Sequence, residues 1–309
     1  MALLKLIRFP NLVIVGLTQY LLFHLLLQPA FHSNGINSLL DTTHFFLLSL
    51  VTLILTATGY IINDIIDLPI DRLNKPHKLI ISKRIALQTA VWLYFCLLLG
   101  GFFVSVYLAF FAGNPTLLTI YPLAFTLLFV YSAAWKKQPL IGNVVVAVFC
   151  AGVAWILLFA EEDAMAVLQE VASDQAQYIT QLFYWYMVFA FLATMFREIV
   201  KDLEDMEGDR VHGCRTLPIA LGQNMAKVIA FGFGVSLVVF LLAMGWNMDQ
   251  LFQRWGAWAF VGISIVLPTI VALALLYRAT QKQEFHRISQ IAKWIMLFGL
   301  LFLMYSSWI

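Results

Sequence analysis

Two groups of aspartates in this chain share one spacing, in which three carboxylates are separated by three and then by four residues. Residues with that spacing lie on one face of a helix, so each group would place three negative charges side by side. Such charges repel one another, and a bound cation would relieve the repulsion. The members are Asp64, Asp67 and Asp71 in the first cluster and Asp202, Asp205 and Asp209 in the second cluster.

Carboxylate oxygens suit a hard divalent cation. Magnesium is usually held by one or two carboxylates, by waters and by the oxygens of a bound phosphate. Two such clusters facing each other therefore predict a diphosphate site that uses Mg²⁺. Basic side chains close by could pair with phosphate oxygens that the metal leaves free. The predicted diphosphate-binding residues are Arg72, Lys75, Lys78, Lys137, Lys201, Arg210 and Arg215.

The alternative is that both clusters are ordinary solvated charges in loops. Two clusters of identical spacing, each at the end of an apolar segment, favour the binding site. Arg72 and Arg210 also follow their clusters at the same offset. This similarity indicates an internal repeat, with halves of about 1–135 and 136–309 inside a single transmembrane domain over 1–309.

The composition shows which solvent these clusters border. Of the 309 residues, 62% are hydrophobic and only 12% are charged, with a mean hydropathy of +0.86. Soluble proteins have about 45–50% apolar and 25% charged residues, so a water-soluble globule is excluded and an all-α integral membrane protein is predicted. The net charge of +2 gives no indication of a nucleic-acid partner.

The hydropathy pattern predicts nine membrane-spanning helices, because a bilayer core needs about 20 apolar residues per helix. Pro69 follows the second of them, and a proline removes a helical hydrogen bond, so we expect Asp71 to lie on a turn beyond the helix. The expected spans are 10–28, 43–62, 87–111, 116–134, 141–160, 179–197, 226–245, 256–276 and 290–308.

Nearly all Lys and Arg residues fall before the first span or in the even-numbered connections. By the positive-inside rule these segments are cytoplasmic. The sequence therefore predicts a protein of the inner cell membrane with a cytoplasmic N-terminus and an outer C-terminus. Both aspartate clusters, and hence the active site, would lie on the cytoplasmic side.

The clusters resemble the two signatures of the UbiA superfamily of intramembrane prenyltransferases. Asn63, Asp64, Asp67, Asp71 and Arg72 match the first signature, and the run from Lys201 to Asp209 matches the second. The resemblance implies nine helices around a central cavity with a cytoplasmic cap. It also implies Mg²⁺-bound polyprenyl diphosphate, with Asn63 joining the six aspartates as metal ligands or near-ligands.

The resemblance further implies prenyl transfer, and two other residues are expected to contribute to it. Water would quench the allylic carbocation left by the departing diphosphate, so apolar and aromatic walls must exclude it. Among the aromatic residues, Tyr131 is the predicted cation stabiliser. Asn11, one turn into the first span, is predicted to contact the diphosphate or its metal shell, and a structural interhelical hydrogen bond is the alternative.

Within the superfamily, the sequences around Asn63 and around Asn11 look most like members that transfer a geranylgeranyl group to the lipid geranylgeranylglycerol phosphate. An aromatic acceptor of quinone biosynthesis, such as 4-hydroxybenzoate, is the main alternative. A membrane transporter is the rival from another class, but it would place acids near the middle of spans.

Overall fold

The computed structural model describes residues 1–74, 79–253 and 255–306. Over these residues the chain is almost entirely helical and contains no β-strand, which confirms the predicted all-α class. The chain divides into two compact units. The first unit comprises Met1–Tyr20 and Ser38–Lys136, and the second comprises Leu21–Asn37 and Lys137–Ile309.

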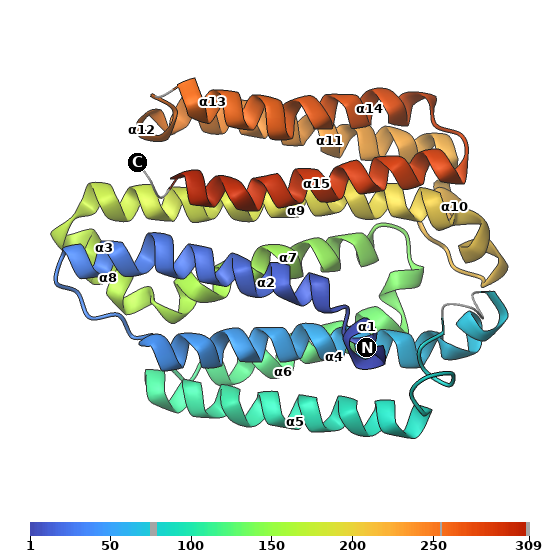
Figure 1. The fold of residues 1–309 in the computed structure, drawn as a ribbon, viewed down its shortest axis with the longest axis horizontal. Coiled ribbons are helices and arrows are strands. Elements are labelled where there is room, and N and C mark those ends of the chain that lie inside the picture. Colours follow the sequence, from blue (N-terminus) through green and yellow to red (C-terminus); the bar gives the residue numbers. More distant parts are fainter. Residues whose placement is uncertain (75–78, 254, 307–309) are drawn as a thin grey trace. The chain divides into compact units, whose positions relative to one another are not determined.

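The first unit is built around one long helix, α4, which carries the first cluster (Figure 1). Its start is capped by Asp41, whose carboxylate accepts a 2.9 Å hydrogen bond from the backbone N–H of His44. This hydrogen bond lowers the pKa of Asp41. The helices of this unit are α1 (Ala2–Leu6), α2 (Phe9–Leu22, leaving the unit at Tyr20), α4 (Thr42–Asn74), α5 (Leu87–Ala112) and α6 (Leu117–Ala133).

Apolar packing holds α1, α4 and α5 together in this unit. Leu6, Ile61 and Tyr94, one from each helix, belong to a single buried cluster. Helices α5 and α6 approach closely at Gly101, where a Cβ atom would lie 2.4 Å from the Tyr121 hydroxyl. That hydroxyl donates a 3.0 Å hydrogen bond to the carbonyl of Leu98, which satisfies a polar group in an apolar setting.

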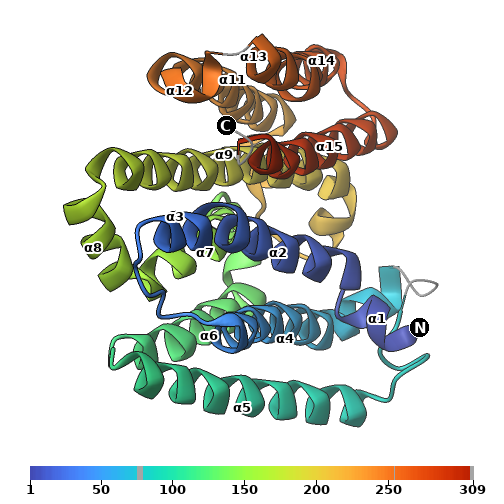
Figure 2. The same ribbon diagram turned by 60° about the vertical axis from the view of Figure 1, so that its left-hand side comes forward.

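The second unit is organised around α9, which packs against α7, α11 and α15. Figures 1 and 2 both show α15 lying along α9. The remaining elements of this unit connect or cover these four helices. The short η2 (Trp135–Lys137) contains the point in the chain where the first unit ends and the second continues. The elements of the second unit are η1 (Phe23–Leu27), α3 (Gln28–Ser33), α7 (Ile141–Ala160), α8 (Glu162–Val171), α9 (Ser173–Val211), α10 (Leu217–Leu221), α11 (Gln223–Asn247), α12 (Asp249–Phe252), α13 (Trp255–Val261), η3 (Gly262–Val266), α14 (Leu267–Arg278) and α15 (Lys282–Ser306).

Eight helical segments of the described residues are long and apolar enough to cross a membrane. They coincide with eight of the nine predicted spans, and the chain is an integral membrane protein. The ninth prediction, 116–134, corresponds to α6, an apolar helix of 17 residues. A count of nine spanning helices is therefore not confirmed.

The expectation for Pro69 was wrong. Helix α4 continues through Pro69 to Asn74, so Asp71 lies on the helix and not on a turn beyond it. A proline removes a single backbone donor, and the five helical residues that follow Pro69 show that this loss does not end the helix.

Candidate active site

The first cluster is organised by a lysine from outside α4. The Lys136 ammonium donates to the Asp67 carboxylate at 2.6 Å and to the side-chain carbonyl of Asn63 at 3.1 Å. Asn63 also donates to the other Asp67 oxygen at 3.1 Å. The Lys136 and Asp67 side chains are only 13% and 22% exposed, so this ion pair is largely withdrawn from water.

Asp64 is directed to a different partner. Its carboxylate is 3.3 Å from the Arg8 guanidinium, and that guanidinium lies 4.6 Å above the centre of the Tyr60 ring. The Tyr60 hydroxyl in turn accepts a 3.0 Å hydrogen bond from the Asn11 amide. The structure therefore contains the interhelical hydrogen bond weighed for Asn11, and contact of Asn11 with the diphosphate stays a prediction.

The other residues predicted for the first cluster are less tightly held. Asp71 is half-buried, and the exposed Arg72 donates a 3.2 Å hydrogen bond to the Ser82 hydroxyl. Tyr131, near the end of α6, is half-buried. The predicted cations Lys75 and Lys78 lie outside the described residues.

The second cluster lies near the end of α9 and is positioned from α7. Asn143, one turn into α7 and buried, donates a 2.9 Å hydrogen bond to the Asp202 carboxylate. At the other end of the cluster, the Thr216 hydroxyl lies 3.5 Å from an oxygen of Asp209. All three aspartates of this cluster are half-buried.

The cations predicted for the second cluster lie in two places. Arg210 and Arg215 are exposed at and beyond the end of α9, and the Arg215 backbone N–H donates to the carbonyl of Lys137 at 2.7 Å. This bond fixes the chain before α7 to the chain after α9. Lys201 is partly exposed and faces Glu198 at 3.9 Å.

The donor atoms of the first cluster fit a bound cation. Within the parts of the chain that the structure describes, no three His, Cys, Asp or Glu side chains converge on one point. Magnesium does not require that, because it usually takes only one or two protein carboxylates. The oxygens of Asn63 and Asp67 already hold a positive group, the Lys136 ammonium, so they have the direction and charge that a metal ion needs.

Three contacts at these clusters were not predicted from the sequence, namely the pairing of Arg8 with Asp64, the pairing of Lys136 with Asp67 and the support of Asp202 by Asn143. A signal for Asn143 was present, because a lone amide in an otherwise apolar span needs a polar partner. No comparable signal identifies which of the adjacent lysines, Lys136 or Lys137, reaches the carboxylates.

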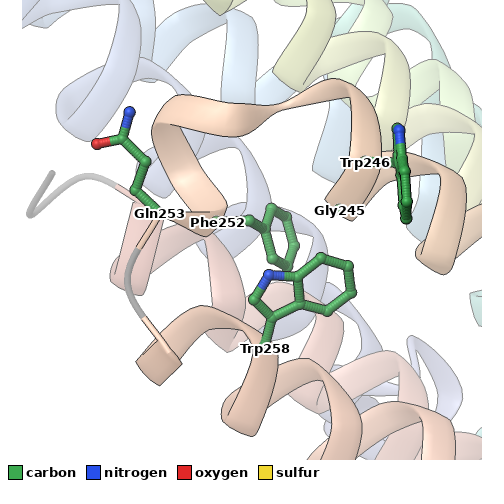
Figure 3. A pocket seen from close by; sticks show the side chains of 5 residues that line it. All are labelled: Gly245, Trp246, Phe252, Gln253 and Trp258. Atoms are coloured by element: carbon green, nitrogen blue, oxygen red, sulfur yellow. The ribbon is translucent and has the colours of Figure 1, made fainter.

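The second unit contains a cavity that is not lined by residues of the second cluster. It has a volume of about 350 Å³ and lies where α11 ends and α13 begins, as Figure 3 shows. The rings of Phe252 and Trp258 form its wall, with centres 4.8 Å apart. A Cβ atom at Gly256 would lie 2.6 Å from the Tyr305 hydroxyl, so this region adjoins the end of α15. The carboxylates of the second cluster lie instead near the beginning of α15, where His286 of α15 pairs with Glu204 of α9.

Comparisons with known proteins agree with the arrangement of helices and motifs. The UbiA prenyltransferase family matches residues 21–306. The digeranylgeranylglyceryl phosphate synthase of Methanopyrus kandleri is 32% identical over 251 residues, which cover 81% of this chain and 83% of that protein.

Solved structures show the same fold. A digeranylgeranylglyceryl phosphate synthase superposes with a TM-score of 0.65 at 25% identity, covering 100% of this chain and 98% of its own. A UbiA homolog from Archaeoglobus fulgidus, bound to DMAPP and Mg²⁺, gives a TM-score of 0.53 at 16% identity and covers 98% of this chain and 99% of its own. The resemblance stated from the two signatures is thereby confirmed, and the chain belongs to the UbiA prenyltransferase family and is an integral membrane prenyltransferase.

Proposed function

We propose that this protein transfers a geranylgeranyl group from geranylgeranyl diphosphate to the free hydroxyl of geranylgeranylglyceryl phosphate. The bond between the prenyl carbon and the diphosphate oxygen breaks, and an ether bond to the acceptor oxygen forms. Diphosphate and the hydroxyl proton leave. The observation that carries this choice of substrates is the 32% identity to a digeranylgeranylglyceryl phosphate synthase over 81% of the chain.

The carboxylates of both clusters are the proposed ligands of the magnesium diphosphate. In the first unit Asn63 and Asp67 would hold Mg²⁺, with Asp64 and Asp71 on the same helix. In the second unit Asp202, Asp205 and Asp209 would do so. A UbiA homolog of the same fold has been solved with DMAPP and Mg²⁺ bound, which supports the metal. When bound, the metal neutralises the negative charge that builds up on the departing diphosphate.

The chain's own cations complete the neutralisation of the diphosphate. Asn63 and Asp67 would hold the metal ion in place of the Lys136 ammonium, and that ammonium would then be available to donate to a phosphate oxygen. Arg72, Lys137, Lys201, Arg210 and Arg215 are the other described candidates, and those that are exposed remain free to reorient. Lys75 and Lys78 keep the same proposed role.

The prenyl tail stays in a water-free environment. Moving it into water would cost about 0.8 kcal/mol per methylene. The reaction therefore takes place with the tail still in the bilayer. Tyr131 offers an aromatic face to the allylic cation. Asn11 and Tyr60 form a hydrogen-bonded pair that could hold a diphosphate oxygen. The distribution of Lys and Arg supports a cytoplasmic N-terminus and a cytoplasmic active site.

The test is turnover by the purified protein in liposomes with Mg²⁺ and labelled geranylgeranyl diphosphate. Acceptors would be geranylgeranylglyceryl phosphate and 4-hydroxybenzoate. We expect the ether lipid and diphosphate as products, and EDTA should stop their formation. Product from 4-hydroxybenzoate alone would refute the proposed acceptor.

Two variants test the metal ligands. Asp67→Ala and Asp202→Ala should each abolish turnover without loss of the folded protein, while Asp163→Ala, an exposed acid on α8, is the matched control. The elution volume in size-exclusion chromatography reports on folding. Full turnover in both cluster variants would contradict the assignment.

A further inference from the structure

We infer that Arg197 and Lys293, one on α9 and one on α15, bind the phosphate group of the prenyl acceptor. This inference rests on the proposed function, which requires an acceptor with a phosphate head. It adds a second anion site that is separate from the two aspartate clusters and lies entirely within the second unit.

The two helices bring these cations together. Helices α9 and α15 pack against each other, and Phe196 and Ala292, which directly precede Arg197 and Lys293, belong to one buried cluster. Figures 1 and 2 show the two helices running alongside each other. Lys293 interacts electrostatically with both Arg197 and Lys201, and also with Glu198 and Glu204.

These five residues form what we call the α9–α15 cluster, and one of its cations, Lys293, has no ion-pair partner among the described residues. The cluster contains three cations and two carboxylates, all on helices that are candidate membrane spans. Glu198 pairs with Arg197 and lies 3.9 Å from Lys201, so one carboxylate serves two cations. Glu204 is engaged with His286 at 2.8 Å. Within the described parts of the chain, Lys293 is therefore left without a carboxylate at ion-pair distance, and an unpaired charge on a candidate membrane span indicates a functional site.

The Arg197 guanidinium also has an unused donor. Its Nε atom is buried and has no hydrogen-bond partner among the described residues. Buried polar groups in native proteins are nearly always hydrogen-bonded, so an exception calls for an absent partner. A guanidinium presents its N–H groups in a planar fork that matches two oxygens of a phosphate. The pairing with Glu198 engages one terminal nitrogen, so the Nε–H remains without a partner in the described chain.

The location suits an acceptor and not the departing diphosphate. Arg197 precedes Asp202 by five residues, which corresponds to about 7.5 Å along a helix axis. A phosphate on Arg197 and Lys293 would therefore lie about 7.5 Å deeper than Asp202, the nearest aspartate of the second cluster. Lys201, which lies between them in sequence, keeps its proposed role at the diphosphate.

The experiment measures binding first and turnover second. Binding of geranylgeranylglyceryl phosphate to the full-length protein in detergent is measured by isothermal titration calorimetry without the prenyl donor, and geranylgeranylglycerol serves as the ligand without phosphate. The variants are Lys293→Met, which alters an exposed residue, and Arg197→Lys, which keeps the charge but removes the fork. Lys282→Met, also exposed on α15, is the control.

We expect Lys293→Met and Arg197→Lys each to weaken binding of the phosphate lipid by about tenfold or more, the size expected for loss of a charge-assisted hydrogen bond. Binding of geranylgeranylglycerol, the KM of the prenyl donor and all properties of Lys282→Met should not change. Glycerol 1-phosphate should compete in the wild type and not in Lys293→Met, which would identify the headgroup as the part recognised.

Phosphate-lipid binding of wild-type strength in both variants would overturn the inference, whatever the turnover. Failure of the proposed function gives a different result. Wild-type protein would then bind the phosphate lipid through Lys293 and Arg197 but form no ether product from it, and the anion site would stand without the reaction.

Discussion

Lys136→Met tests whether a lysine ammonium takes the position of the metal ion in the first cluster. The substitution keeps an unbranched side chain, one atom shorter, but removes the charge that Asp67 and Asn63 share. Asp67 then stays partly buried without its cation. Removing one partner of a fully buried ion pair costs about 3–5 kcal/mol. Since Asp67 is 22% exposed, water recovers part of this, and we expect the free energy of unfolding to fall by about 2 kcal/mol.

The same substitution should strengthen metal binding. In the wild type, a divalent ion must displace the ammonium from two oxygen atoms, whereas in Lys136→Met it meets an unpaired carboxylate. If the displaced hydrogen bonds are worth about 1.5–3 kcal/mol, affinity should rise by about ten- to a hundredfold. Electron paramagnetic resonance of free Mn²⁺ gives this affinity, and thermal unfolding in detergent with EDTA or Mg²⁺ gives the stability.

Two results together would refute this role of Lys136: unfolding of Lys136→Met at the wild-type temperature in EDTA, and binding of Mn²⁺ by Lys136→Met with wild-type affinity. Lys83→Met, which alters an exposed lysine of the same unit, should leave both quantities unchanged. Turnover is a separate outcome. It should decrease in Lys136→Met although metal binds more tightly, because the ammonium is no longer available to the diphosphate.

Two further predictions concern the second unit. Asn143→Leu removes the donor that positions Asp202, so kcat should fall about tenfold and more Mg²⁺ should be needed for half-maximal turnover, with Asn224→Leu on exposed α11 surface as control. Wild-type Mg²⁺ dependence would contradict this role. Gly299→Val would place a Cβ atom 2.0 Å from Cε1 of Phe189, and the overpacking should lower stability in thermal unfolding by about 1–3 kcal/mol. Gly232→Ala, where nothing lies within 4 Å, should not destabilise, and equal stability of both variants would refute the close contact of α9 and α15.

The helices could be predicted from the sequence because hydropathy in a membrane depends on residue type alone. The span expected at 141–160 is found as α7 with the same bounds, and 87–111 differs from α5 by one residue. The polar ends were less predictable. The second and sixth spans were expected to end at 62 and 197, but α4 extends to Asn74 and α9 to Val211. Charged residues end an apolar segment without ending a helix, so both clusters lie on helices and not in loops.

Side-chain partners could not be predicted in the same way. The sequence places Asp64 and Asp67 on one helical face, but the structure gives them different cations, Arg8 and Lys136. Both cations come from outside α4, so their reach depends on packing that hydropathy does not encode. The spacing of a motif therefore identifies which residues share a surface, whereas the contacts within that surface follow from tertiary structure.

The position of the acids also separates an enzyme from the rival transporter hypothesis. Asp64, Asp67 and Asp71 all lie in the last third of α4, and the second cluster lies in the last third of α9. An ion pathway needs charged or polar groups through the middle of its spans. The residues at the centres of these two helices are instead uncharged, with Ala57 and Ile61 buried on α4 and Phe189 and Ala193 buried on α9, and the charged run toward the end of α9 begins only at Arg197. Charge gathered at helix ends, next to apolar helix, suits a substrate with an anionic head and a long hydrocarbon tail.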